Sequence, residues 1–372
     1  MSDLILSNLY RDVSSGFTFP TFTPVSERKL AIARASIFSG HSDDFVGIEY
    51  EIENCIKEHV IPAGNARIFG NYWDITEDGS LRNNGLEFVS KPLKGVHVAN
   101  ALLSLKEVLG HAYPGHKATS RCGIHVHINA LDLSVTQVMA WLSVYMVFER
   151  QLFKYSGARD KNLFCLPTWA WNNNIKQAMQ VFNIDERSQR TAIRTLQEYG
   201  LKYAGMNTLP LGEHGTLEFR QMGTITDFGK ISMWVELLTN IKTYARSVNS
   251  VNDLKALWKK LGALNTTSEY GAFMGEVFGT SASELWYDDY EKTMAKGVVA
   301  VKELEIIHNK TVATALAAPR LDRGIGEELM RAYMRTPSVY TMIEDEVAVP
   351  EVDNRLHMAS VELQSRLSVA SI

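Results

Sequence analysis

The segment FVGIEYEIE, residues 45–53, alternates apolar and acidic side chains with a period of two. That period is typical of a β-strand, in which successive side chains point to opposite faces. The apolar face would carry Val46, Ile48, Tyr50 and Ile52, and the opposite face Glu49, Glu51 and Glu53. Ionised acids two residues apart on a strand repel each other, so this face favours a bound cation. A solvated strand face is the simpler interpretation of this segment taken alone.

A second segment with the same two faces is GLEFVS, residues 85–90. Leu86 and Phe88 alternate there with Glu87. The segment follows the tripeptide DGS, a composition typical of a tight turn, which would present the carboxylate of Asp78. The sequence therefore predicts a second strand with an acid on its polar face and an acid on the loop before it.

The third segment, CGIHVHIN, covers residues 122–129 and carries two histidines. His125 and His127 are two positions apart, so on a strand both imidazoles would project from the same face. Such a pair suits metal binding. Either histidine alone is more often a hydrogen-bonded structural residue.

The fourth segment, TLEFRQM, covers residues 216–222 and places Glu218 and Arg220 on one face. Residues 202–211, KYAGMNTLPL, would form the other arm of a hairpin, with residues 212–215 as its turn. An acid and an arginine two apart could simply neutralise each other at the surface. That interpretation does not account for the polar faces of the other three strands.

The four strands together predict one antiparallel sheet, with its apolar faces on helices and its polar faces lining a cavity. Carboxylates with one or two imidazoles are a ligand set suited to Mg²⁺ or Mn²⁺, whereas Zn²⁺ would more often draw cysteines or several histidines. An arginine beside such metals commonly contacts a phosphoryl group in transfer.

Apolar spacing predicts the helices of an α+β fold. The predicted helices span residues 98–109, 135–155, 175–199 and 231–248. Beyond residue 250 the pattern is helical to about residue 317, with breaks near Gly271 and Gly279. We therefore expect an N-terminal extension (1–43), with a helix at 26–38, a core (44–250) that holds the motifs, and a helical C-terminal region (251–372) that contains an acidic stretch at 344–353.

Composition sets limits on the function. The chain has 372 residues, of which 45% are hydrophobic and 22% charged, as in a folded globular protein. Its formal net charge of -4 does not favour tight binding to duplex nucleic acid. Three scattered cysteines, Cys55, Cys122 and Cys165, indicate neither a disulfide framework nor a structural zinc site. With no segment predicted to cross a membrane and no secretion signal, we expect a cytoplasmic protein.

In their order along the chain, the motifs resemble the amidoligase family. They are GxExE, DGS, LEFVSxP, CGIHVHIN, RxxN-F-C-xP and GTLEFRQxGT. The resemblance covers residues 46–225, a little under half of the chain. The family is known from bacteria, fungi and bacteriophages, so the cytoplasm of a bacterium or of a phage-infected host is the expected location.

The resemblance implies a glutamine synthetase-like fold, in which a curved antiparallel sheet holds ATP and two or three Mg²⁺ or Mn²⁺ ions on its concave face. The metal ligands implied by matching positions are Glu49, Glu51, Asp78, Glu87, His125 and Glu218. Glu53 and His127 share these faces but have no assured counterpart in the better-known relatives. The resemblance also implies that Arg220 contacts the transferred phosphate.

The implied reaction is ATP-dependent formation of an amide or isopeptide bond through an acyl phosphate. Glu218 and Arg220 would be its catalytic residues. Arg159 and Asn162 match a family motif and would contact nucleotide or substrate, unless they only form a helix C-terminal cap and a loop contact. Lys202 and Asn207 could contact phosphate or the acyl substrate. No base for the amine proton is identified.

Three other functions stay open. A guanidino kinase would share the fold and stop after phosphoryl transfer. A barrel-fold amidohydrolase would also use a His-x-His strand, but it requires a parallel strand-helix repeat. A non-catalytic protein would only bind a metal or a partner. The expected substrates are small-molecule or peptide carboxylates and amines, with a modified nucleobase as a further option, and a homo-oligomer is possible.

Overall fold

The computed structural model describes residues 45–54, 72–112, 118–157, 159, 162–168, 173–183, 185–285 and 290–308. The chain divides into two compact units, Met1–Asn309 and Lys310–Ile372, and all described residues belong to the first. The predictions for residues 1–43 and for the acidic stretch at 344–353 lie outside the described residues. In the described ranges, no helix has both the length and the apolar character needed to cross a lipid bilayer.

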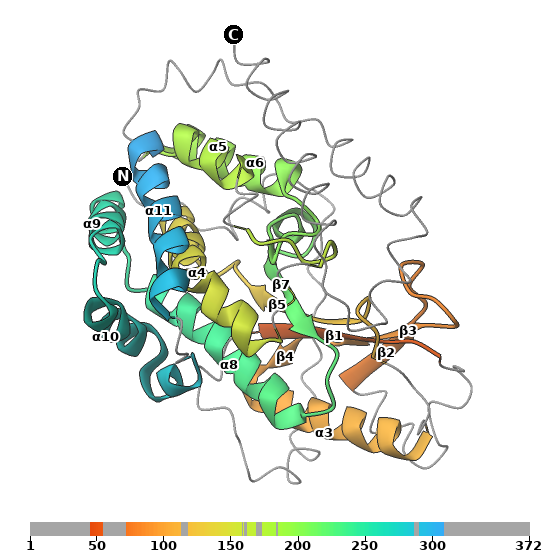
Figure 1. Cartoon of the computed structure of the whole chain (residues 1–372). Coiled ribbons are helices and arrows are strands. Elements are labelled where there is room, and N and C mark those ends of the chain that lie inside the picture. The colour runs from red at the N-terminus through yellow and green to blue at the C-terminus, as the bar shows by residue number, and fades with distance from the viewer. Residues whose placement is uncertain are drawn as a thin grey trace, which may run out of the picture. The chain divides into compact units, whose positions relative to one another are not determined.

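The architecture is mixed α/β, with one curved antiparallel sheet of seven strands and nine α-helices in the described part of the chain (Figure 1). The strands are β1 (Phe45–Ile52), β2 (Trp73–Thr76), β3 (Leu86–Ser90), β4 (Leu93–Lys94), β5 (Gly123–Asn129), β6 (Met206–Asn207) and β7 (Thr216–Gly223). The helices are α3 (Gly95–Ala112), α4 (Val135–Tyr155), α5 (Asn173–Val181), α6 (Glu186–Tyr199), α7 (Pro210–Glu213), α8 (Phe228–Ala245), α9 (Val251–Gly262), α10 (Thr267–Phe278) and α11 (Tyr290–His308). A 3₁₀ helix, η4 (Gly279–Leu285), follows α10.

The strands of the sheet are ordered β2-β3-β1-β5-β7-β6, and β4 pairs with the start of β1. Each of these pairings is antiparallel. The four predicted strands are therefore confirmed as neighbours in one sheet, with β1, β5 and β7 at its centre. Pairing between strands far apart in sequence fixes which side chains lie opposite one another.

The apolar face of the sheet packs on helices, as the alternation predicts. Val46, Ile48 and Tyr50 of β1 are at most 1% exposed. The rings of Trp141 and Tyr145 on α4 lie 5.9 and 5.5 Å from the ring of Phe219 on β7. Helices α4 and α8 lie side by side (Figure 1). The core therefore lies on the side of the sheet opposite the acids.

Three of the four predicted helices are observed as single helices, and the one predicted for residues 231–248 is α8, which begins and ends three residues earlier. Helix α4 begins and ends at the predicted residues, and α3 extends the predicted segment at both ends. The helix predicted for residues 175–199 is wrong as a single element, because it is interrupted between α5 and α6. Asp185 causes this interruption: its side chain accepts a hydrogen bond from the Ser188 amide and caps α6.

The breaks predicted after residue 250 are half correct. Gly279 ends α10 with a φ of 56° and thus confirms one of them. Gly271 does not break a helix, because it lies inside α10. The actual break falls at residues 263–266, where Thr266 forms a capping box with Glu269.

The predicted hairpin before β7 is also corrected. Its first arm is only two residues long in the sheet, Met206 and Asn207 of β6. The connection to β7 contains the short helix α7, which Pro210 begins. Proline fits the first turn of a helix because its missing N–H is not needed there, and this explains why a longer strand does not form.

Helix α11 packs closely on α4. At Gly297, a Cβ atom would come within 2.5 Å of the Met146 carbonyl oxygen and within 2.7 Å of the Val147 Cα. Glycine is therefore required for this approach of two helix backbones. Helices α9 and α11 both contact α4, so these two helices contribute to the described core.

Candidate active site

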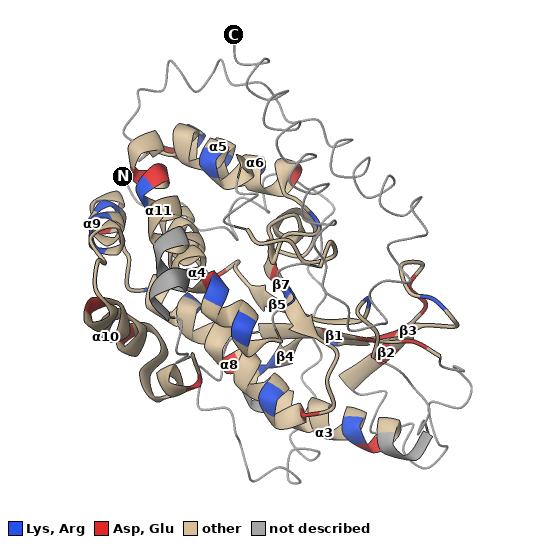
Figure 2. Ribbon diagram, in the orientation of Figure 1, with Lys and Arg blue, Asp and Glu red and all other residues tan. Residues whose placement is uncertain are grey.

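The register of the sheet brings the predicted polar residues into direct opposition. Glu51 of β1 lies opposite Glu87 of β3. On the other side of β1, Glu49 lies opposite His125 of β5. His127 of β5 in turn lies opposite Glu218 of β7. Acidic residues lie along β1 and β3 and are coloured red in Figure 2. Residues from four segments of the chain thus converge on one face.

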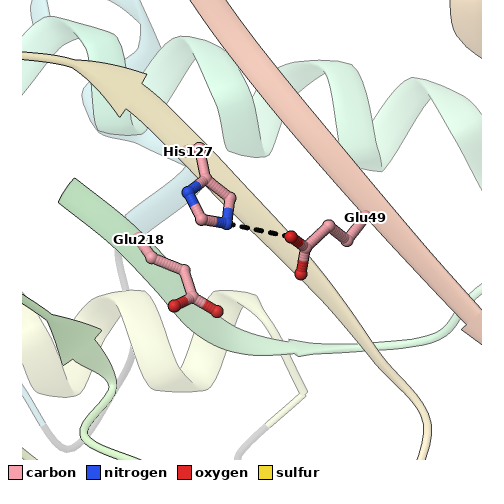
Figure 3. Close-up of side chains that lie close together, drawn as sticks. All are labelled: Glu49, His127 and Glu218. Atoms are coloured by element: carbon pink, nitrogen blue, oxygen red, sulfur yellow. Dashed lines mark ion pairs between the residues drawn. The ribbon is translucent and has the colours of Figure 1, made fainter. Parts of the chain in front are cut away.

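Three adjoining groups of side chains could each hold a metal ion. In each group the potential ligand atoms lie within 4.8 Å of one another. The first cluster is Glu49, His127 and Glu218 (Figure 3), the second is Glu49, Glu87 and His125, and the third is Glu51, Asp78 and Glu87. Glu49 is shared by the first two clusters and Glu87 by the last two, so the clusters form a continuous row.

His125 lies at the centre of this row and is 4% exposed. Its Nδ1 lies 2.9 Å from a Glu49 oxygen and 3.6 Å from a Glu218 oxygen. Its Nε2 lies 3.8 Å from a Glu51 oxygen. The imidazole is therefore surrounded by carboxylates from two strands. His127 makes a similar contact, with its Nε2 3.2 Å from the second oxygen of Glu49.

The carboxylate of Glu218 is held at both oxygens. Oε1 accepts a hydrogen bond from the Arg220 guanidinium. Oε2 accepts one of 2.6 Å from the side-chain amide of Asn207 on β6. Glu218 is 4% and Arg220 8% exposed, so this pair is largely removed from water. A carboxylate that binds a metal ion or contacts a reacting group must be held in a fixed orientation, and these two hydrogen bonds provide it.

A β-bulge lies at Arg220. Ile124 of β5 pairs with Met222 and Val126 with Phe219, so β7 has one more residue than β5 between the two pairs. Arg220 and Gln221 thus lie opposite His125 alone. Gln221 donates a hydrogen bond to the hydroxyl of Tyr145 on the helix side. Bulges next to functional sites commonly redirect a side chain, and here Arg220 remains on the acidic face.

Gly123 allows the start of β5 to approach the site. Its amide donates a 2.6 Å hydrogen bond to Glu51. A Cβ atom at this position would lie 2.7 Å from an Arg159 nitrogen and 2.9 Å from His125 Nε2. No larger residue fits without displacing one of these groups.

The ionisable groups of the site shift one another's pKa values in opposite directions. Burial alone would raise the pKa of Glu49, but hydrogen bonds from His125 and His127 lower it well below its usual range. Burial would also raise the pKa of Glu218, and the Arg220 charge lowers it. Glu87 differs: burial, followed by the negative charge of Glu49, raises its pKa to about 7. The metal-free site therefore has excess negative charge, which Glu87 relieves by binding a proton.

This shift makes the stability of the metal-free protein depend on pH. Because the pKa of Glu87 is about 7 in the folded state and near its usual 4.5 when unfolded, the folded state binds more protons between these values. The contribution of the Glu87 carboxyl to the free energy of unfolding is fully present below about pH 4.5 and is lost as pH rises through about 7. We expect Glu87→Gln, which stays neutral, to remove this loss. Urea unfolding of the wild type and of Glu87→Gln, in EDTA at pH 5 and pH 7.5, measures this loss. The same change in the free energy of unfolding between the two pH values in both proteins would contradict the prediction.

Other predicted residues lie at the border of the site. Arg159 donates to the backbone oxygens of Met222 and Ser120. Asn162 donates to the same Ser120 oxygen at 2.6 Å. Their contact with nucleotide stays a prediction, as does that of Lys202, which is exposed with its ammonium 5.8 Å from the Tyr203 ring centre.

Two of the predicted ligands have different surroundings. Asp78 belongs to the third cluster although it lies on the loop between β2 and β3. Glu53, with three per cent exposure, is in none of the three clusters. One of its oxygens instead accepts a 2.8 Å hydrogen bond from the Arg82 amide.

Sequence reasoning missed Arg121 and the aromatic pair beside it. The Arg121 guanidinium lies 5.0 Å from the ring centre of Phe164, and the Phe164 and Tyr203 rings are 5.8 Å apart. Arg220 in turn lies 5.9 Å from the Tyr203 ring centre. The available signal for Arg121 was its position immediately before CGIHVHIN. For Phe164 it was its place in the motif RxxN-F-C-xP, whereas Tyr203 had none, because its partners are distant in sequence.

The fold and the site define a mixed α/β protein with an acidic, metal-competent centre on an antiparallel sheet. The family model described as "putative amidoligase enzyme" matches residues 49–242, just over half of the chain. The chain therefore belongs to the amidoligase family and is an enzyme of the ligase type. No curated protein matches it. The matched residues contain the three clusters, Arg220 and most of the sheet.

Proposed function

We propose that this protein is an ATP- and Mg²⁺-dependent carboxylate-amine ligase that forms an amide or isopeptide bond through an acyl phosphate. The observation that carries the proposal is the row of three carboxylate-rich clusters ending at the buried Glu218 and Arg220 pair. Acids and an arginine on one rigid sheet face can hold the cations and the phosphates of a nucleotide together.

The donor set fits Mg²⁺ or Mn²⁺. The three clusters comprise five carboxylates and two imidazoles and contain no cysteine. Oxygen-rich sites of this kind suit hard divalent cations. The residues that would hold them are Glu49, Glu51, Asp78, Glu87, His125, His127 and Glu218. When bound, the cations supply positive charge that offsets these acids and the phosphates of ATP.

Arg220 is placed to stabilise the phosphoryl group in transfer. Its guanidinium is always charged, and its hydrogen bond to Glu218 fixes its position. In the first step a substrate carboxylate oxygen attacks the γ-phosphorus of ATP, the bond to ADP breaks and an acyl phosphate forms. In the second, an amine attacks the acyl carbon, loses a proton and expels inorganic phosphate. Glu218 would orient Arg220 and would be a metal ligand in the first cluster.

We also propose that the fold is glutamine synthetase-like. Support comes from the antiparallel sheet with acids on one face and helix α4 packed on the other. The barrel-fold amidohydrolase is disfavoured, because the named strands of the described sheet pair antiparallel rather than in a parallel strand-helix repeat. A guanidino kinase fits the same geometry, and only the dependence on an amine separates it from a ligase.

The test uses ATP turnover with a general amine. Purified protein with Mg²⁺ is supplied with panels of amino acids, small carboxylates and peptides, and hydroxylamine serves as amine. We expect carboxylate-dependent release of ADP with an equal amount of hydroxamate. ADP formed with a phosphorylated guanidine instead would indicate the kinase. Failure of the protein to bind ATP with Mg²⁺ by calorimetry would contradict the proposal and favour a non-catalytic role.

The substrates are proposed only by class. Small-molecule or peptide carboxylates and amines form the first panel, and a modified nucleobase with an attached carboxylate or amine forms the second. The cytoplasm, where ATP is supplied, stays the proposed place of action. Size-exclusion chromatography with light scattering tests whether the protein forms a homo-oligomer.

A further inference from the structure

Asp78 differs from the other members of the three clusters because it lies on a loop. The others lie on β1, β3, β5 and β7, where the hydrogen-bonded ladder fixes their positions. The loop between β2 and β3 is largely exposed, including residues 82–84. An exposed loop has many conformations unless contacts restrict it. A contact must therefore hold Asp78 near Glu51 and Glu87.

The loop has local structure, but this does not connect it to the sheet. The Asp78 carboxylate accepts hydrogen bonds from the Ser80 amide (2.7 Å) and hydroxyl (2.9 Å). The Leu81 amide donates to the Asp78 carbonyl oxygen. These bonds shape the turn and orient the Asp78 side chain within it. They would persist if the whole turn moved away from the sheet.

Besides a backbone hydrogen bond from the Asn54 amide to the Asn83 carbonyl oxygen, two buried side chains connect the loop to the sheet. Arg121 donates from Nε and from Nη2 to the Ser80 carbonyl oxygen, the first bond measuring 3.1 Å. Glu53 accepts the hydrogen bond from the Arg82 amide. The two side chains lie 3.8 Å apart, Arg121 Nε to Glu53 Oε1, and are 8% and 4% exposed. Each residue of the pair thus binds the backbone of the turn, on either side of Leu81.

We propose that Glu53 and Arg121 are positioning residues that hold Asp78 in the third cluster, and that Glu53 is not itself a metal ligand. The inference rests on the proposed function for the nature of the ion. Arg121 and Glu53 hold the turn in the conformation in which Asp78 can bind an ion. Less conformational entropy of the turn is therefore lost when the ion binds. The first two clusters do not contain Asp78, so their affinity does not depend on this pair.

The test combines metal titration with hydrogen exchange. Free Mn²⁺ is followed by electron paramagnetic resonance in the wild type, Arg121→Leu, Asp78→Asn and Glu53→Gln. We expect Arg121→Leu and Asp78→Asn to raise the dissociation constant of the same one class of site by about tenfold or more, as for other residues that orient ligands. The remaining classes keep wild-type affinity. Arg187→Leu, at an exposed arginine on α6, serves as the matched control and leaves all classes unchanged.

Hydrogen exchange separates positioning from direct ligation. Without metal, the amides of residues 79–84 should exchange faster in Arg121→Leu than in the wild type, and less so in Arg121→Lys, which keeps one donor. Wild-type exchange in Arg121→Leu, or faster exchange with unchanged Mn²⁺ affinity, overturns the proposal. So does a Glu53→Gln protein that loses the ion while its loop exchanges as in the wild type, because Glu53 would then be a ligand. The exchange measurement needs no metal, so it tests the contact of Arg121 and Glu53 with the turn even if the wild type binds no Mn²⁺. Absence of Mn²⁺ binding by the wild type would count against the proposed function instead.

Discussion

Arg220→Ala should lower the rate of ligation by about 10³-fold or more, the range found when an arginine that stabilises a transferring phosphoryl group is lost. The guanidinium of Arg220 is buried and is bound to the Glu218 carboxylate. Alanine supplies no charge there, and Arg220→Lys would not restore the rate because an ammonium cannot form the same planar contacts. Single-turnover release of ADP measures the chemical step directly. Arg194→Ala, at an exposed arginine of α6, should keep the wild-type rate.

Glu218→Gln tests the partner of Arg220 with little change in shape. The amide keeps an oxygen for the Asn207 donor but removes the negative charge from the first cluster. We expect ligation to be lost while the circular dichroism spectrum stays that of the wild type. Wild-type ligation by either the Arg220→Ala or the Glu218→Gln protein would remove both residues from the proposed mechanism.

Gly297→Ala should lower the free energy of unfolding by about 2 kcal/mol, within the range for overpacked cores. The added methyl group would meet backbone atoms of Met146 and Val147 at 2.5–2.7 Å. Backbone atoms of a buried helix cannot turn aside as a flexible side chain can, so α11 must shift on α4. Urea unfolding followed by tryptophan fluorescence measures the effect.

Gly275→Ala is the matched control. Gly275 also lies inside a helix, α10, but nothing lies within 4 Å of the position of an added Cβ. Alanine favours helix over glycine, so we expect this variant to gain about 0.5–1 kcal/mol. Equal effects of the two substitutions would show that α11 does not contact α4 closely in solution.

The sequence predicted the polar face of the sheet because the alternation of side chains is local. Glu49, His125 and Glu218 each lie in a strand whose period of two is visible in a few residues. Which strands are neighbours cannot be derived from such periods: the sequence predicted one antiparallel sheet for the four strands, and the structure provides their order in it. The pairings Glu49 with His125 and His127 with Glu218 are properties of the register, and only the structure provides them.

The parts that sequence could not predict depend on contacts between distant segments or on capping. The helix expected at residues 175–199 is divided because Asp185 caps α6, a signal hidden within an otherwise regular apolar pattern. The bulge at Arg220 appears only when β7 is paired with β5. The role of Arg121 depends on Ser80, 41 positions earlier.

The central position of β7 has a consequence for synthesis of the protein. Glu49 and His125 are 76 positions apart, and Glu218 and Arg220 follow later still. A chain leaving the ribosome can therefore pair β1 with β5 before β7 exists, and β5 then has an open edge. At that stage the acids of β1 and β3 are present without Arg220. An unfinished chain would hold most of the candidate ligands but none of the proposed catalytic residues, so activity would begin only when the last strand joins the sheet.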